Sequence, residues 1–200
     1  MKDINGTVVV DLTHTEEDIL KNLQKDARYG IHRAQRDGLI VERAIGDDNW
    51  NEYYNIYKET LVEGGGSTDT LEELKKESIV FFVCKKEGKI IAGATIKMKR
   101  DRPTLYTNAS IKEYQINQPN NLLYWTCILW CKKQGYKEFD LGGWQINAFD
   151  HLSGVNNFKV KWGKVEYYFE EYPFVKAMGR KLIRNFKFFW WLNKKLKGRR

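Results

Sequence analysis

The 200-residue chain lacks any long apolar stretch: charged residues make up 30% of it, and no run of 18 apolar residues occurs. A helix that spans a bilayer needs about 20 mostly apolar residues, so the sequence excludes one. The first 20 residues hold five acidic side chains and no apolar segment after a basic start, which argues against a cleaved secretory signal. These absences favour a cytoplasmic protein.

Cysteine is also scarce. The three cysteines, Cys84, Cys127 and Cys131, cannot all pair within one chain, and this favours a reduced, cytosolic protein. Cys127 and Cys131 lie four residues apart in a segment rich in Leu and Trp, which is typical of helix packing rather than of a redox pair. The three histidines stand apart and no zinc-type spacing occurs, so we expect no metal site.

Apolar residues, by contrast, are plentiful. Hydrophobic residues make up 42% of the chain and aromatic residues 14%, which is far more than a disordered chain carries. The length suffices for one domain with its own core and is short for two. The net charge of +8 is concentrated at one end, because residues 175–200 hold ten basic side chains and no acidic one, whereas residues 1–174 have a net charge of −2. We predict one domain over residues 1–174 and a basic tail, residues 175–200.

The basic tail has apolar residues at helical spacing, with basic residues on the remaining face. The apolar positions are Val175, Met178, Leu182, Phe186, Phe189 and Trp190. A basic amphipathic helix is typical of an anionic membrane surface, which would place the protein at the inner face of the membrane. Two other uses stay open: the tail binds tRNA phosphates, or it packs on its own domain or on a second subunit.

Strand and helix patterns alternate along the predicted domain. The predicted elements are a strand over 7–11, one helix from Thr13 or Thr15 to Gly38, a strand over 39–44, a helix over 47–62, strands over 79–84, 89–97 and 105–110, a helix over 122–133, a strand over 138–141, a helix, and a strand over 165–169. The strands over 79–84 and 89–97 are expected to join through a hairpin turn at Glu87-Gly88. This order is typical of an α/β domain with a mixed, mostly antiparallel sheet flanked by helices. It is compatible with an N-acetyltransferase-like (GNAT) fold.

Four short segments carry a more specific signal when they are taken in order. They are the helical pattern over 19–39, the run from Leu122-Leu123-Tyr124-Trp125 to Gly135-Tyr136, the sequence Phe139-Asp140-Leu141-Gly142-Gly143, and the sequence Asn157-Phe158-Lys159-Val160-Lys161-Trp162-Gly163. Over residues 7–175 this order and spacing resemble the Fem family of peptidoglycan-bridge aminoacyltransferases and the related acyltransferases of the same fold.

The resemblance implies an N-acetyltransferase fold and an amide-forming reaction. Well-known Fem enzymes transfer an amino acid from aminoacyl-tRNA to an amine on the stem peptide of a peptidoglycan precursor. For this chain we expect no cofactor. These enzymes usually contain two such domains, and this chain resembles the C-terminal one. Whether a second copy in a homo-oligomer supplies the missing half of the cleft stays open.

The resemblance also assigns candidate catalytic residues. Lys159 matches the lysine of the family's Phe-Lys motif, which lies near the reacting ester, so it would bind the oxyanion or the terminal tRNA phosphates. Phe158 would form an apolar wall or stack on the terminal adenine. The alternative is a solvated lysine on a loop before a strand. Asp140 and Asp150 are candidates for a general base, although each residue is more typical of a turn or a helix cap.

A basic cluster on the first long helix is a candidate phosphate-binding face. Its members are Lys25, Arg28, Arg33 and Arg36. The alternative is a solvated helix face that is partly paired with Asp26 and Asp37. Tyr106 lies roughly where related enzymes place a tyrosine that contacts the substrate, and its alternative is an ordinary half-buried strand aromatic.

One absence bears on the acyl donor. Acetyl-CoA-dependent enzymes hold the pyrophosphate in a Gly-rich loop at a helix start, and the equivalent residues here, 111–120, contain no glycine. Together with this absence, the resemblance to the Fem family implies amide formation by transfer from aminoacyl-tRNA to a peptidoglycan precursor, and this is the function that we predict. The alternatives are an N-acyltransferase that uses an acyl-CoA or an acyl carrier, and a non-catalytic module that binds a polyanion or a membrane.

Overall fold

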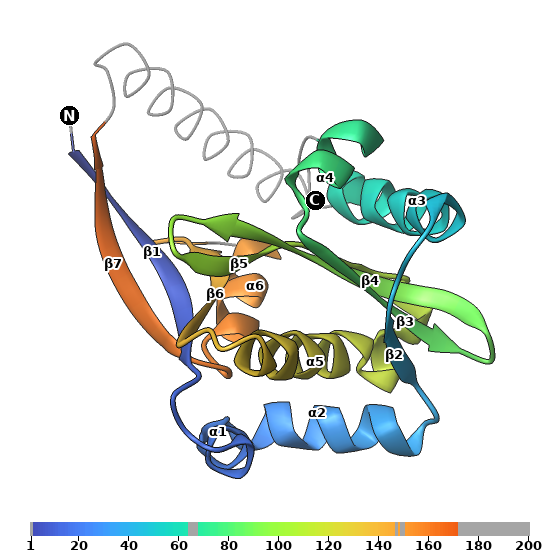
Figure 1. Ribbon diagram of the computed structural model, residues 1–200, viewed down its shortest axis with the longest axis horizontal. Helices are drawn as coiled ribbons and strands as arrows, with labels where there is room; N and C mark the ends of the chain where they lie inside the picture. Colours follow the sequence, from blue (N-terminus) through green and yellow to red (C-terminus); the bar gives the residue numbers. More distant parts are fainter. Residues whose placement is uncertain (1, 64–67, 147, 149–150, 172–200) are drawn as a thin grey trace, which may run out of the picture. The chain divides into compact units, whose positions relative to one another are not determined.

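The computed structural model describes residues 2–63, 68–146, 148 and 151–171 (Figure 1). Among these, Gly6–Glu166 form one compact unit, and residues 2–5 and 167–171 belong to a second. The helix predicted over the basic tail lies outside the described residues, so the predicted division at residue 174 stays a prediction. Within the described ranges, every helix is too short or too polar to reach across a bilayer.

The sheet has seven strands in the order β2-β3-β4-β5-β6-β1-β7. Their bounds are β1 Lys2–Asp11, β2 Ile40–Arg43, β3 Val80–Lys86, β4 Lys89–Lys99, β5 Arg102–Ser110, β6 Glu138–Trp144 and β7 Lys164–Glu171. The pairs β1–β6, β2–β3, β3–β4 and β4–β5 are antiparallel, and β5–β6 is parallel. The predicted mixed, mostly antiparallel sheet is therefore confirmed, as is the hairpin turn at Glu87-Gly88, where both residues have a positive φ.

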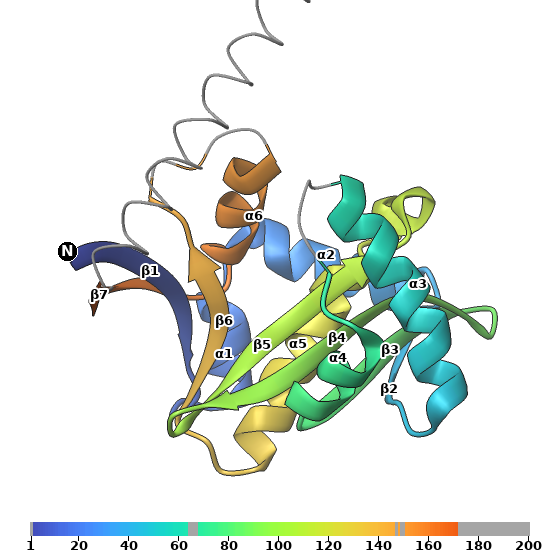
Figure 2. The ribbon, with the colours of Figure 1, turned by 90° about the horizontal axis from the view of Figure 1, so that it is seen from above.

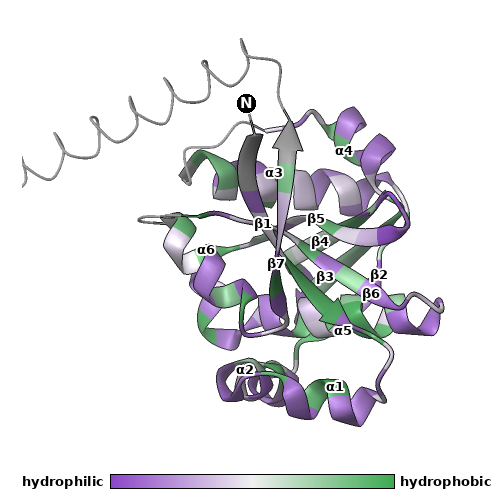
Figure 3. Ribbon diagram, turned by 90° about the vertical axis from the view of Figure 1, so that its left-hand side faces the viewer, coloured by the Kyte–Doolittle hydropathy of each residue, from purple (hydrophilic) through white to green (hydrophobic). Residues whose placement is uncertain are grey.

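Helices cover both faces of the sheet (Figure 1). On one face lie α1 (Glu16–Asn22), α2 (Lys25–Arg36) and α5 (Pro119–Lys133); on the other lie α3 (Asp47–Glu63) and α4 (Leu71–Glu77); the remaining helical segments are η1 (Lys112–Asn117) and α6 (His151–Lys159). Each face has its own apolar cluster, the larger around α2 and α5 and the smaller around α3. Figure 3 shows the hydrophobic colour in the central strands and the hydrophilic colour on the outer sides of α2 and α4.

The single helix predicted up to Gly38 is wrong, because the structure divides it into α1 and α2. Thr15 caps α1, as the sequence suggested, by accepting a hydrogen bond from the Asp18 backbone N–H at 3.1 Å. The break follows at Leu23, whose backbone is extended. The Gln24 backbone N–H donates to the Lys161 carbonyl at 3.0 Å, so a contact with a distant segment replaces the helical hydrogen bond that periodicity alone would predict.

Strand β5 pairs very differently with its two neighbours. It pairs with β4 along almost its whole length, from Lys99↔Arg102 to Ala92↔Ser110. It pairs with β6 at one position, Thr104↔Asp140, and Figure 2 shows the two strands diverging beyond it. Gly142, two residues after Asp140, has a φ of 79°, the left-handed conformation that glycine adopts most easily. This local turn belongs to the segment of β6 that separates from β5.

Candidate active site

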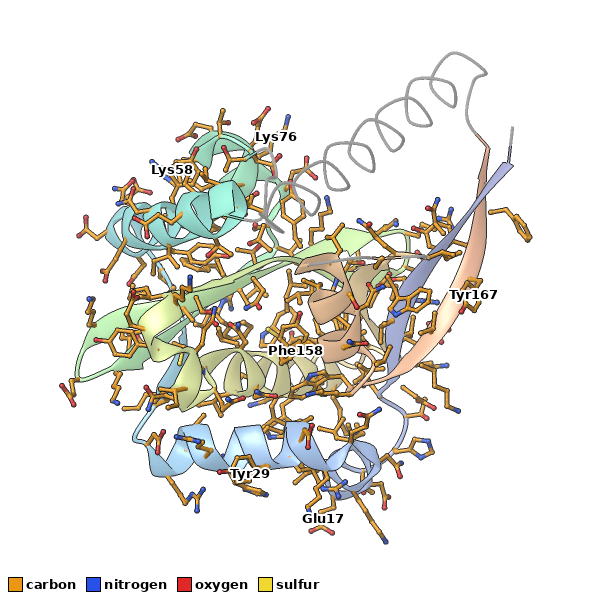
Figure 4. All side chains as sticks on the ribbon, turned by 180° about the vertical axis from the view of Figure 1, so that it is seen from behind. Glu17, Tyr29, Lys58, Lys76, Phe158 and Tyr167 are labelled. Carbon is orange, nitrogen blue, oxygen red and sulfur yellow. The ribbon has the colours of Figure 1, made fainter. Side chains whose placement is uncertain are left out.

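A cleft of about 540 Å³ opens where β5 and β6 part. Among its lining residues, β5 contributes Leu105, β6 contributes Leu141, the first turn of α5 contributes Asn120, and the end of α6 contributes Phe158 and Lys159. Figure 4 shows Phe158 between α6 and α5. The cleft is thus formed by segments that are far apart in the sequence.

The wall at the start of α5 consists of uncharged polar side chains. Asn108 on β5 donates to the Asn120 side-chain oxygen at 3.2 Å, and Asn120 donates to the Ser110 hydroxyl at 3.2 Å. Gln118 begins the helix with a φ of 61°, and Pro119 follows it at the position where a missing N–H is tolerated. A short 3₁₀ helix and a left-handed glutamine therefore take the place of a glycine-rich loop.

The opposite wall is held by packed aromatic rings. Phe158 meets the buried Tyr124 of α5 edge to face, with ring centroids 5.0 Å apart and an interplanar angle of 85°. The buried Trp162 lies 5.4 Å from the Tyr124 ring and 6.1 Å from the Phe158 ring. Such geometries are favourable for aromatic pairs, so the end of α6 has a well-defined position. Burial raises the pKa of Tyr124, which therefore remains neutral.

Lys159 is the last residue of α6, not a loop residue. Its Nζ donates a hydrogen bond to the Gly143 carbonyl at 3.0 Å, which directs the ammonium toward the diverging end of β6. Burial lowers the pKa of Lys159 to about 8, and the charge of Asp140 opposes that shift. An ammonium that is partly desolvated and hydrogen-bonded to one carbonyl retains donors for an oxygen that gains negative charge.

Asp140 is buried in the sheet behind this wall and is absent from the residues that line the cleft. One carboxylate oxygen accepts from the Thr7 hydroxyl and from the Gly142 backbone N–H, the latter at 2.7 Å. The position of Asp140 therefore does not offer a base to a substrate in the cleft. The other candidate base, Asp150, lies outside the described residues.

The basic cluster lies on α2, and none of its four residues lines the cleft. Arg28 donates to the carbonyls of Lys21, at 2.8 Å, and Leu23, which satisfies the end of α1. Arg33 pairs with Asp37 at 3.6 Å, while Lys25 and Arg36 are exposed. The structure does not bring the cluster together with Lys159, and its phosphate-binding role stays a prediction.

Tyr106 also lies apart from the cleft lining. Its hydroxyl donates to the Asp69 carboxylate at 2.5 Å, and the Lys97 ammonium lies 3.7 Å from the centre of its ring. Burial and the Asp69 carboxylate raise the pKa of Tyr106. The ring packs with the apolar cluster around α3, and the role of Tyr106 in substrate binding stays a prediction.

Sequence reasoning missed the polar wall and Tyr124. Pro119 was an available signal for the start of α5, because proline is common in the first turn of a helix. No sequence signal indicates that Asn108 and Asn120 face each other, since they belong to different elements. Among the residues that the structure describes, no group of three His, Cys, Asp or Glu side chains could hold a metal ion.

The comparisons with known proteins agree with this architecture. A family model described as "Acetyltransferase (GNAT) domain" matches residues 21–160. No curated protein matches the chain in sequence. Among solved structures, FemX has a TM-score of 0.69 and 14% identity over 83% of this chain and 59% of its own.

Two further solved structures are similar. The C-terminal domain of a lysylphosphatidylglycerol synthetase assigned in Agrobacterium fabrum has a TM-score of 0.66 and 19% identity over 84% of this chain and 60% of its own. The L-PGS of Bacillus licheniformis has a TM-score of 0.61 and 20% identity over 88% of this chain and 64% of its own. At these identities the likeness shows the fold, and this chain spans about three fifths of each protein. The family match covers more than half of the sequence, so the chain belongs to the acetyltransferase (GNAT) domain family and is an acyltransferase.

Proposed function

We propose that this acyltransferase transfers an aminoacyl group from aminoacyl-tRNA to an amine on a peptidoglycan precursor. The observation that carries the proposal is the placement of Lys159, whose ammonium lies in the wall of the cleft formed by β5, β6 and α6. Lysine at this position matches the Phe-Lys motif of the Fem resemblance, and FemX is among the similar structures. Another of the similar structures is named for a product that carries a lysyl group.

The chemistry requires one bond to form and one to break. The acceptor amine attacks the ester carbonyl, the new C–N bond forms, and the C–O bond to the terminal ribose breaks. The proton that the amine loses ends on the ribose hydroxyl. The carbonyl oxygen becomes negatively charged in between, and the Lys159 ammonium donates a hydrogen bond to it, which stabilises the transition state more than the ground state.

The polar wall supports a donor other than a classical acyl-CoA. A pyrophosphate needs several converging backbone N–H groups or cations, and the described residues at the start of α5 present Asn and Gln side chains and a proline instead. Asn and Gln amides have both donors and acceptors, which suits a ribose, a base or a peptide. This wall would therefore hold the nucleoside end of the donor or the stem peptide of the acceptor.

The pH dependence follows from two titrations with opposite signs. The acceptor amine must be neutral to attack, so the rate rises with pH at first. Lys159 must be protonated to donate, so the rate falls as the pH passes its pKa of about 8. No carboxylate is present among the described residues that line the cleft, so we assign neither limb to a protein general base. The expected profile is a bell whose alkaline limb belongs to Lys159.

In this proposal the basic tail, residues 175–200, binds the membrane surface at which the acceptor lies. A lipid-linked precursor lies at an anionic membrane surface, where each nearby basic residue contributes about 1 kcal/mol of binding. We expect the full chain to sediment with anionic vesicles and a chain ending at Pro173 to stay in solution. Sedimentation of both would remove the tail from this role, and sedimentation of neither would leave tRNA or protein contacts as its use.

The identity of the donor is tested by supplying each candidate donor in turn. The full chain is incubated with a peptidoglycan precursor and, in separate reactions, with charged tRNA, acetyl-CoA or an acylated carrier protein, and products are identified by mass. We expect an aminoacylated precursor from charged tRNA alone. Product from acetyl-CoA or the acyl carrier alone would contradict the proposal, and product from no donor would favour a binding module. A precursor with a blocked side-chain amine is the matched control and should give no product.

A further inference from the structure

Asp140 is a buried carboxylate with an unusual setting. Its side chain is only 6% exposed, and one oxygen accepts hydrogen bonds from the Thr7 hydroxyl and the Gly142 N–H. No ion pair within 4.0 Å reaches it among the residues that the structure describes. Burying an ionised carboxylate is unfavourable unless a cation or several hydrogen bonds stabilise it. Packing alone therefore does not explain why a carboxylate stands at residue 140.

The hydrogen bond from Gly142 shapes the turn that carries the lysine's acceptor. A carboxylate that accepts from the backbone N–H two residues later closes a local turn, and here Gly142 adopts a φ of 79°. A Cβ added at Gly142 would lie 3.6 Å from the Lys159 Nζ and 3.2 Å from the Leu105 carbonyl. The turn thus passes directly beside the ammonium, and the next carbonyl, that of Gly143, accepts from Nζ at 3.0 Å.

Asp140 also acts on Lys159 through charge. Burial lowers the pKa of Lys159, and the negative charge of Asp140 partly offsets this effect by raising the pKa. The resulting pKa is about 8. Among the other titratable groups near this wall, Tyr124 lines the cleft from α5 and stays neutral because burial raises its pKa. Arg102 at the start of β5 also experiences the charge of Asp140 but is paired with Glu138 and Glu166. Asp140 is therefore the anion that supports the ammonium.

We propose that Asp140 is a positioning residue for Lys159: its carboxylate holds the Gly142-Gly143 turn that orients the ammonium, and its negative charge stabilises that ammonium in the cleft. The proposal rests on the role of Lys159 in the proposed function. It assigns Asp140 a role different from that of a general base, because the carboxylate is hydrogen-bonded inside the sheet and does not line the cleft.

The first test measures Lys159 itself and needs no substrate. Trace labelling with acetic anhydride between about pH 6 and 10, followed by peptide mass analysis, reports the fraction of Lys159 that is neutral at each pH. The wild-type midpoint is expected near pH 8. Asp140→Asn keeps a hydrogen-bond acceptor and removes the charge, so the midpoint should fall by about one unit.

A matched control removes a different charge from the same strand. Glu138→Gln lies two residues before Asp140 and is paired with Arg102, so it should leave the Lys159 midpoint unchanged. If Asp140→Asn does not give a native melting curve, Asp140→Ser also keeps a hydrogen-bonding oxygen without the charge, and the same fall is expected. An unchanged midpoint in a folded Asp140 variant overturns the proposal.

The second test separates this inference from the proposed function. In the transfer assay, the alkaline limb of kcat/KM should move to lower pH in Asp140→Asn by the same amount as the labelling midpoint. A purely structural role would lower kcat/KM at every pH without moving the limb, and this result would also overturn the proposal. A labelling shift in a protein that transfers nothing from charged tRNA would retain the Asp140 assignment and reject the donor.

Discussion

Strand β5 pairs with two neighbouring strands, β4 and β6, and the two contacts have different roles. With β4 it forms a long antiparallel ladder with one register shift between Thr95 and Ile96. Tyr53 of α3 is fully buried against this part of the sheet, and its hydroxyl bonds the Thr107 hydroxyl at 2.9 Å. With β6, strand β5 shares one pair and then diverges, and the cleft with Lys159 occupies the divergence. The closed contact stabilises the domain, whereas the open one leaves room for a substrate. Substitutions on the two sides should therefore have different consequences.

The largest effect is expected on the open side. Lys159→Met removes the ammonium while keeping the apolar stem, so turnover should fall by about 10²–10³-fold, equivalent to about 2.7–4 kcal/mol of transition-state stabilisation. Single-turnover rates with charged tRNA measure it. Lys161→Met is the matched control, because Lys161 pairs with Asp26 at 3.3 Å and lies outside the cleft, and it should retain turnover. An equal loss of turnover in Lys159→Met and Lys161→Met would show that the ammonium of Lys159 has no special role in the reaction.

The next effect is expected on the closed side. A Cβ at Gly93 of β4 would lie 2.5 Å from the Tyr53 ring, which is fully buried. Gly93→Ala should therefore lower the free energy of unfolding by about 1–3 kcal/mol, the range typical of overpacked cores. Urea denaturation measures the loss. Turnover per folded molecule should stay at the wild-type value, and a selective loss of turnover would show that the closed side also determines activity.

A smaller effect is expected where β6 turns away from β5. Gly142→Ala places a non-glycine residue in the left-handed conformation, which costs about 1–2 kcal/mol, and brings a methyl group near the Lys159 Nζ. Both stability and turnover should fall. Gly143→Ala is the control, since a Cβ there meets no atom within 4 Å and its φ is not positive. If Gly142→Ala and Gly143→Ala have the same stability and turnover, the left-handed turn at Gly142 has no role in either property.

The smallest effect is a gain in stability. The folded state lowers the pKa of Lys159 from 10.5 to about 8, so below pH 8 the native protein holds a cation that is better solvated in the unfolded chain. This penalty is relieved as the pH rises from 8 toward 10.5. Lys159→Met should therefore be more stable than wild type by about 1 kcal/mol at pH 7, because solvent screens part of the shift for a half-buried side chain.

Thermal melts at pH 7 and near pH 10 measure this difference. The gain should shrink at the higher pH, where the wild-type lysine is neutral in the folded state. A gain that is the same at both pH values would indicate better packing by methionine rather than relief of a buried charge.

Most elements of the fold could be predicted because their signals are local. Apart from α4 and η1, the strands and helices from residue 39 onward follow the apolar pattern, and Glu87-Gly88 is the expected turn. Helix α4 was missed although Thr70 and Glu73 form a capping box, a signal readable in the sequence. The division into α1 and α2 was not readable, because the Gln24 backbone bonds to Lys161.

The candidate site was predictable in part. Phe158 and Lys159 were selected by a short motif, and the structure places both in the cleft. The basic cluster on α2 was selected by helical spacing, yet spacing does not say which way a helix faces, and its residues lie outside the cleft. Asn108 and Asn120 were missed because their neighbourhood exists only after β5 and α5 pack together.

The sequence by itself determined three general properties: a hydrophobic fraction of 42% sufficient for a folded domain, a strand and helix order typical of an α/β domain with a mixed sheet and compatible with an acetyltransferase-like fold, and a positive charge concentrated in residues 175–200. These properties depend on composition and on periodicity over a few residues. Only the tertiary structure decided that β5 and β6 pair at one position and that Lys159 lies in the resulting cleft beside the turn held by Asp140. The reason is physical: strand pairing, burial and the pKa of a partly buried lysine depend on residues that meet across long sequence separations.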